Sequence, residues 1–186
     1  MEELEIIQAA KNGDKAALTV LVKKYSNTIY NFAYKICRDR EKAENTMQET
    51  FLSMIKSISS FNNNSKLSTW LYRIVANHCL MEARNSKKNL FVDVETDDSL
   101  FDEKYIVDWS TLPIKQLENK ELKSILDKAI KQLSPDYRII FTLRDVEQLS
   151  IEETSKITGL SIPAIKSRLH RARAYLRKEI TKELSL

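Results

Sequence analysis

The scarcity of helix-breaking residues is the feature that most limits how this chain can fold. Only 2 glycines and 3 prolines occur among its 186 residues. A β-sandwich or β-barrel uses such residues in its many turns, whereas both residues destabilise the interior of a helix. We therefore expect an all-α protein. The length allows either one domain or two small ones.

The first 88 residues predict a bundle of amphipathic helices. Asp14 and Asp39 are each positioned to cap the N-terminus of a helix. The helical pattern breaks at residues 60–68 and returns over about residues 69–87. Apolar residues recur at spacings of mostly three and four in the first long helix, at Leu18, Leu21, Val22, Tyr25, Ile29, Phe32 and Ala33.

A second helical domain is expected over residues 114–186. Its pattern resumes at Ile114, and Ser134 with Pro135 predicts a new helix start, because proline is favoured in the first helical position. Residues 89–113 mix acidic and apolar positions without a sustained period, which indicates a flexible acidic linker.

The charge distribution suggests a polyanionic partner. Residues 1–88 hold 14 basic and 9 acidic side chains, residues 89–110 hold 1 and 7, and residues 111–186 hold 15 and 10. Two basic blocks thus flank an acidic one, and basic surfaces bind nucleic acid by releasing its condensed counterions. The alternative is that these charges are the ordinary solvated surface of helices.

Several classes of function are disfavoured. No stretch approaches the roughly 20 apolar residues that cross a bilayer, and residues 1–12 hold no signal-peptide core, so we expect a cytoplasmic protein without membrane insertion. Cys37 and Cys79 lie far apart in the sequence and form no CxxC pair, which favours buried free thiols over a disulfide framework or a zinc site. No cluster of His, Cys or carboxylate residues has the spacing of metal ligands or of a catalytic site, and His78 and His170 fall in different predicted domains. We therefore expect no metal, no cofactor and no small-molecule substrate, and we do not expect an enzyme.

Residues 150–173 carry the pattern of a helix-turn-helix. Small Ser155 stands where two helices would approach, and Gly159 stands where the turn needs a positive φ. Ser161 is positioned to cap the second helix, with Pro163 in its first turn.

The second helix of this motif has an apolar side and a cationic side. Ile165, Leu169, Ala172 and Leu176 have 4-3-4 spacing and are expected to face inward. A recognition helix in the DNA major groove needs an apolar side that packs on its own domain. Its other side needs hydrogen-bond donors for the base edges and cations for the phosphates. The alternative is an amphipathic helix with a solvated basic face.

This segment resembles region 4 of the sigma-70 superfamily, and residues 165–173 are similar to the version in the extracytoplasmic-function (ECF) subgroup. Thr154, Ser155 and Pro163 depart from the residues usual in that family. The resemblance implies binding of the minus-35 promoter element by Ser161, Ala164, Lys166, Ser167, Arg168, His170, Arg171 and Arg173.

The N-terminal block resembles region 2 of the same family in two places. Residues 43–51 are similar to the stretch that docks on the clamp helices of the largest polymerase subunit, which implies polymerase binding by Glu44, Asn45, Gln48 and Glu49. Residues 61–77 are similar to the promoter-melting element that captures a flipped base of the non-template strand. The residues implied in minus-10 binding and melting are Phe61, Asn62, Asn63, Asn64, Lys66, Arg73, Asn77, Arg84, Lys87 and Lys88. Trp70 is expected to lie in the core.

The resemblance predicts an ECF sigma factor with region 2 over residues 1–88 and region 4 over residues 114–186. It implies core RNA polymerase (through the clamp helices and the flap of the second-largest subunit), duplex and single-stranded promoter DNA, and an anti-sigma factor as partners. That inhibitor could hold the protein at the membrane. The acidic linker would occupy the RNA exit path, or act only as a soluble tether. The alternative function is a stand-alone helix-turn-helix regulator with a ligand-binding helical domain. Such a regulator would form a dimer and would contain a large apolar pocket.

Overall fold

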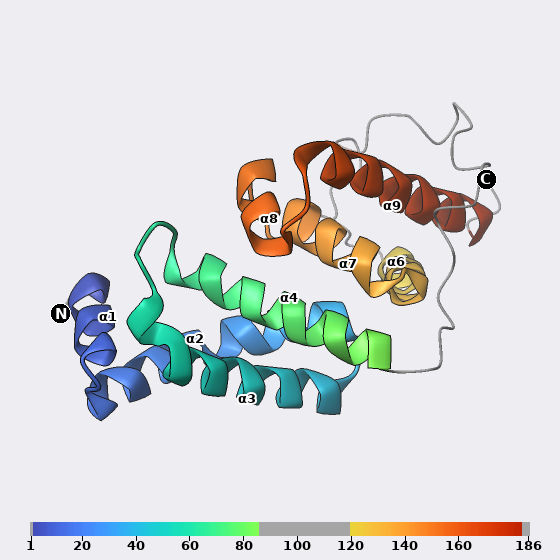
Figure 1. The fold of residues 1–186 in the computed structure, drawn as a ribbon. Coiled ribbons are helices and arrows are strands. Elements are labelled where there is room, and N and C mark those ends of the chain that lie inside the picture. The colour runs from blue at the N-terminus through green and yellow to red at the C-terminus, as the bar shows by residue number, and fades with distance from the viewer. Residues whose placement is uncertain (1, 86–119, 184–186) are drawn as a thin grey trace. The chain divides into compact units, whose positions relative to one another are not determined.

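The computed structural model describes residues 2–85 and 120–183, and every regular element in these two stretches is a helix. The chain divides into an N-terminal and a C-terminal unit. The all-α prediction with two helical domains is therefore confirmed (Figure 1). The predicted linker, residues 89–113, lies outside the described residues.

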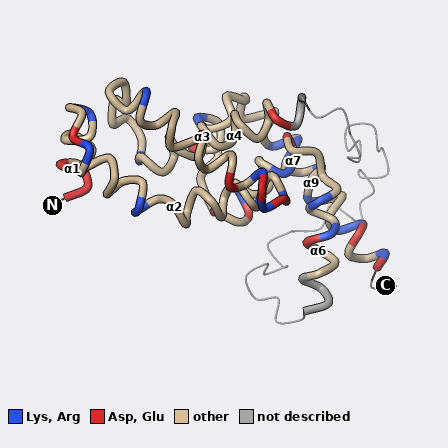
Figure 2. The backbone as a smooth tube through the Cα atoms, turned by 90° about the horizontal axis from the view of Figure 1, so that it is seen from below, with Lys and Arg blue, Asp and Glu red and all other residues tan. Residues whose placement is uncertain are grey.

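The N-terminal unit is a bundle of four α-helices. They are α1 (Glu3–Lys11), α2 (Lys15–Cys37), α3 (Arg40–Ser57) and α4 (Leu67–Asn85), with a short 3-10 turn, η1 (Ile58–Ser60), after α3. Helix α2 packs against the other three α-helices, so it is the centre of the unit. Figure 2 shows that the short α1 carries both acidic and basic residues.

Helices α2 and α3 begin where the sequence predicts. The Asp14 carboxylate accepts hydrogen bonds from the backbone amides of Ala16 (2.8 Å) and Ala17 (3.3 Å). The Asp39 carboxylate accepts one from the amide of Lys42 at 2.9 Å. Each aspartate thereby satisfies amides that have no partner within the helix.

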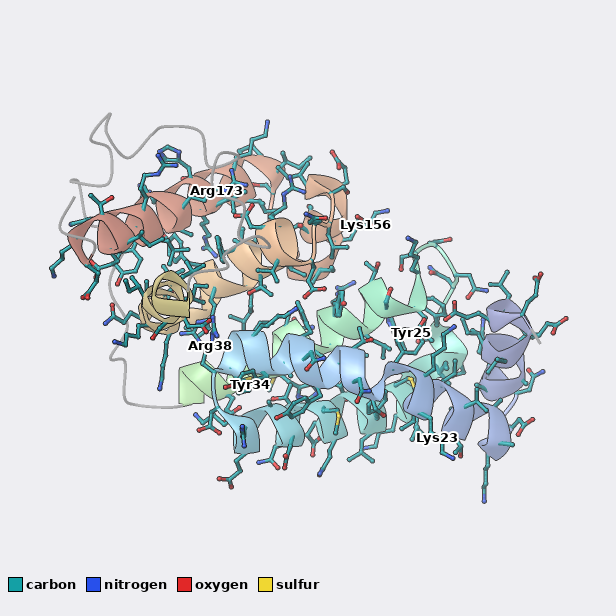
Figure 3. The ribbon with its side chains drawn as sticks, turned by 180° about the vertical axis from the view of Figure 1, so that it is seen from behind. Lys23, Tyr25, Tyr34, Arg38, Lys156 and Arg173 are labelled. Atoms are coloured by element: carbon teal, nitrogen blue, oxygen red, sulfur yellow. The ribbon has the colours of Figure 1, made fainter. Side chains whose placement is uncertain are left out.

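The core of this unit is the predicted apolar stripe of α2 packed against α3 and α4. Leu21, Ile29 and Ala33 are fully buried, and the Phe32 ring lies 4.2 Å from the ring of Tyr72 on α4. Leu18, Val22 and Tyr25, also in the predicted stripe, are only half-buried. The Tyr25 hydroxyl donates to the Glu3 carboxylate, which ties α1 to α2 (Figure 3).

Over its described residues, 120–183, the C-terminal unit has four α-helices and one π-helical turn. They are α6 (Lys120–Gln132), α7 (Pro135–Phe141), the π turn η5 (Thr142–Val146), α8 (Ile151–Thr158) and α9 (Ile162–Glu183). Helices α6, α7 and α8 all pack against α9. As predicted, Pro135 occupies the start of α7 after Ser134.

A buried arginine closes the junction between α6 and α7. Arg138 is only 2% exposed, and its guanidinium donates hydrogen bonds to three carbonyls at the end of α6: Ile130 (3.0 Å), Lys131 (2.7 Å) and Leu133 (2.6 Å). The last carbonyls of a helix have no intrahelical partner and lie at its negative end. Arg138 satisfies them from the neighbouring helix.

No helix within residues 2–85 and 120–183 combines the length and the apolar character that crossing a membrane requires.

Candidate nucleic-acid interface

Helices α8 and α9 form the predicted helix-turn-helix. Gly159 has φ of +72°, and its amide donates to the Ser155 carbonyl at 2.8 Å, so the glycine ends α8 in the left-handed conformation. The Ser155 hydroxyl bridges the turn by donating to the Leu160 carbonyl at 2.7 Å. The Ser161 hydroxyl accepts a hydrogen bond from the Ala164 amide at 3.4 Å, as expected of a helix cap.

Thr154 is buried, although it is a polar residue within the apolar interior of this motif. Its hydroxyl donates to the Ser150 carbonyl at 2.9 Å. A buried hydroxyl with a partner costs little, so threonine is tolerated at this position. Ser150 also forms a capping box with Glu153, which the S-x-x-E spacing signals in the sequence and which was not among the predictions.

The two sides of α9 divide as the spacing predicts. Ile165, Leu169, Ala172 and Leu176 are all buried. The rest of the surface of α9, together with Ser161 just before the helix, is what we call the α9 face. It presents exposed Ser161, Lys166 and Ser167 with half-buried Ala164, Arg168, His170 and Arg171. Hydroxyls and cations on one exposed side of a helix can meet base edges and phosphates in a major groove.

Two cations predicted to bind DNA have carboxylate partners inside the unit. The Arg168 guanidinium lies 3.4 Å from the Asp136 carboxylate on α7. The Arg173 Nε donates to the Asp145 carboxylate on η5 at 3.0 Å, and a second nitrogen donates to its other oxygen. Because the Asp145 side chain is only 8% exposed, Arg173 (Figure 3) neutralises a nearly buried charge. This geometry favours a structural role for Arg173.

We expect Arg173→Ala to lower the free energy of unfolding by about 1–3 kcal/mol, because it strands the Asp145 carboxylate and removes two charge-assisted hydrogen bonds. Chemical denaturation followed by circular dichroism measures this loss. Lys182→Ala, on the exposed end of the same helix, is the control and should change stability by less than about 0.5 kcal/mol. Equal stability of both variants would contradict a structural role.

A second exposed row of side chains follows helix α4. This row, the α4 stripe, comprises Lys66, Trp70, Arg73, Asn77 and Met81, which share one side of the helix through spacings of three and four. Leu67, Leu71 and Val75, in the same turns, are buried. The stripe therefore joins two cations, an aromatic ring and an amide on a surface that the core does not use.

The polar loop before α4 is fixed at its start. Phe61 is 4% exposed, and its ring lies 5.3 Å from that of Trp70. The Lys11 ammonium on α1 donates to the Phe61 carbonyl at 2.8 Å. Asn62, Asn63 and Asn64 are exposed, with Asn63 at φ of +58° and the Asn64 amide bonded to the Asn62 side chain at 3.2 Å.

The aromatic residues of this segment lie differently from the sequence expectation. Trp70, which we expected in the core, is only half-buried, whereas Phe61 is almost fully covered. The Phe61 ring packs against the Trp70 ring, and Trp70 offers the more accessible ring of the two. Arg84 lies in the last turn of α4, its side chain outside what the structure describes, and Lys87 and Lys88 lie outside the described residues.

The polar face predicted on α3 is exposed and continues into an apolar end. Glu44, Asn45, Gln48 and Glu49 are all exposed, as are Leu52 (48%) and Ile55 (46%). We call these six residues the α3 face. Its two apolar members were not predicted from the sequence. The sequence feature that could have identified them is their helical position, which lies off the buried stripe of α3 that includes Ala43, Phe51 and Met54.

Two family models match the chain in succession. The Sigma-70 region 2 model matches residues 21–89, which include α3 and the α4 stripe. The model of Sigma-70, region 4, matches residues 123–176, which include the helix-turn-helix.

Relatives that match over nearly their whole length point to the same family. The chain is 32% identical over 176 residues to the ECF RNA polymerase sigma factor SigW of Bacillus subtilis, covering 94% of each chain. It is 27% identical to the RNA polymerase sigma-H factor of Pseudomonas aeruginosa, covering 96% of this chain and 94% of the relative.

Solved structures share the fold. The sigma factor RpoE in complex with the anti-sigma factor NepR from Bartonella quintana matches with a TM-score of 0.60 and 26% identity, over 92% of this chain and 96% of that one. CnrH in complex with the cytosolic domain of CnrY matches with a TM-score of 0.63 and 18% identity, over 93% of each chain.

Proposed function

The chain belongs to the ECF RNA polymerase sigma factors of the sigma-70 family. We propose that three of its surfaces bind core polymerase, the melted minus-10 strand and the minus-35 duplex. It is a transcription initiation factor and not an enzyme. A stand-alone helix-turn-helix regulator is not favoured, because models of both sigma regions match the chain in the expected order. Residues 1–88 would act as region 2 and residues 114–186 as region 4.

The α9 face is our candidate for reading the minus-35 duplex. The observation that carries the proposal is that Lys166 and Ser167 on α9, and Ser161 just before it, are exposed while the apolar residues of α9 fill the core. Arg168, His170 and Arg171 would supplement them at phosphates or base edges. We leave Arg173 out of this set because Asp145 holds it.

The α4 stripe and the preceding loop are our candidate for holding the melted minus-10 strand. Single strands bind to cations that follow the phosphates and to aromatic rings on which bases stack. Lys66 and Arg73 supply the cations, Trp70 supplies the accessible ring, and Asn77 supplies an amide. The exposed loop residues Asn62–Asn64 would complete a site for one unstacked base, with the Phe61 ring packed against Trp70.

The α3 face is our candidate for docking on core polymerase. Its N-terminal part carries two carboxylates and two amides, which suit an arginine-rich partner helix. Its C-terminal part presents Leu52 and Ile55, whose burial would contribute hydrophobic binding free energy.

The matched complex with an anti-sigma factor suggests how this chain is regulated. RpoE of Bartonella quintana is seen with an anti-sigma factor, and we propose that such an inhibitor also restrains this chain. We place its action in the cytoplasm, where core polymerase works. Residues 89–110, with 7 acidic and 1 basic side chains, would occupy a basic channel until nascent RNA displaces them.

Two sets of substitutions separate the two DNA-binding roles. In holoenzyme with core polymerase, Lys166→Ala and Arg168→Ala should each weaken binding to the minus-35 duplex by about 1–3 kcal/mol. Asn77→Ala should leave duplex binding intact and lower strand opening, measured by permanganate reactivity of unpaired thymines. Lys128→Ala, an exposed charge on α6, is the matched control. Loss of duplex binding in Asn77→Ala, or normal opening, would contradict the division.

A further inference from the structure

The two cysteines of the chain meet inside the N-terminal unit. Cys37 is the last residue of α2 and Cys79 lies in the middle of α4, yet their sulfur atoms are 2.8 Å apart. Their distance along the sequence did not indicate this contact, which arises because helices α2 and α4 pack side by side and bring the two residues together. The cysteines are not joined by a disulfide.

The two thiols differ in their access to solvent. Cys79 is only 4% exposed, whereas Cys37 is half-buried at the end of its helix. The hydrogen bond with Cys37, together with burial, raises the pKa of the Cys79 thiol well above its ordinary value. The Cys79 thiol therefore stays protonated and shielded from solvent. A small reagent reaches Cys37 first.

We propose that Cys37 and Cys79 form an oxidisable dithiol site whose substrate is a hydroperoxide. The Cys37 thiol gives up its proton and its sulfur attacks the terminal peroxide oxygen. The O–O bond breaks, and the departing oxygen takes the proton that the thiol released and leaves as water or an alcohol. The sulfur of Cys79 then attacks the Cys37 sulfenic acid. The S–S bond forms as the S–O bond breaks, and the leaving hydroxide takes the Cys79 proton as water. The two thiols lose two electrons and the peroxide gains them.

The bond would stabilise the unit without covering its proposed binding surfaces. It links the end of α2 to α4 across a separation of 42 residues, and a crosslink that closes so long a loop reduces the entropy of the unfolded chain. Neither cysteine belongs to the α3 face or to the α4 stripe, although Cys79 lies two positions after Asn77. Oxidation should therefore leave the fold of the promoter-melting region intact and more stable.

The test treats the full chain with hydrogen peroxide. Mass spectrometry should show a monomer two hydrogens lighter with no titratable thiol, and the N-terminal unit should melt at least about 5 °C higher, reversed by dithiothreitol. The chain has only these 2 cysteines, so the assignment of the bond is unambiguous. A disulfide-linked dimer, or an oxidised chain that melts no higher than the reduced one, would overturn the proposal.

Two single substitutions test the order of events. Cys79→Ser should stop at a sulfenic acid on Cys37 that dimedone traps, whereas Cys37→Ser should react at least about tenfold more slowly with peroxide because the buried thiol alone remains. Equal reactivity of the two variants would refute the assigned roles. A reduced-state melting temperature close to that of the parent chain checks that each variant folds.

Discussion

Replacing Arg138 with alanine is expected to destabilise the C-terminal unit by about 3–5 kcal/mol. The variant loses three hydrogen bonds and leaves the carbonyls of Ile130, Lys131 and Leu133 without the guanidinium donor, two of them, Ile130 and Leu133, in a buried setting. Small domains are stable by only about 5–15 kcal/mol, so a large fraction of the unit would be unfolded on warming. Thermal and chemical denaturation measure the loss.

Arg138→Lys separates charge from geometry. A lysine keeps the positive charge but cannot present the planar fork that reaches three carbonyls, so we expect it to recover only part of the stability. Lys131→Ala, an exposed neighbour, should change the unfolding free energy by less than about 0.5 kcal/mol. If Arg138→Ala were as stable as Lys131→Ala, the role assigned to the guanidinium would be wrong.

Leu52→Asp with Ile55→Asp is expected to weaken binding to core polymerase about a hundredfold, or about 2.7 kcal/mol, while leaving the fold intact. Both side chains are about half exposed in the isolated chain, so a charge there meets water and not the core. In the docked complex the same charges would be buried without partners. Titration of labelled core polymerase measures the affinity.

Val20→Asp is the matched control for the α3 face. Val20 is 46% exposed on α2, close to the values for Leu52 and Ile55, but it lies outside the proposed docking surface. Its replacement should leave polymerase affinity within about twofold of the parent chain. An equal loss of affinity in both variants would mean that the α3 face is not the docking surface.

Local rules predicted the helix ends correctly. Asp14, Asp39 and Gly159 act through hydrogen bonds or backbone angles within a few residues, so their roles follow from the sequence alone. The inward residues of α9 were also predictable, because helical spacing fixes which side chains share a side. The resemblance to the sigma-70 family added the order of the two regions, which spacing could not supply.

Contacts between distant parts of the chain were not predictable from spacing. The cysteine pair depends on how α2 packs on α4, and the link from Arg173 to Asp145 depends on the π turn that follows α7. A cationic side chain has the same helical position whether it faces DNA or a carboxylate. For the same reason, the sequence could not tell that Phe61 is covered while Trp70 is accessible.

The role proposed for this chain is to give promoter specificity to core RNA polymerase. Run-off transcription by purified bacterial core polymerase, with and without the chain, on promoter fragments from the source genome measures that role. We predict transcripts with a defined start only when the chain is present, and their loss with the Leu52→Asp, Ile55→Asp variant. If no chain-dependent start appeared across those promoters, the proposed role would be wrong.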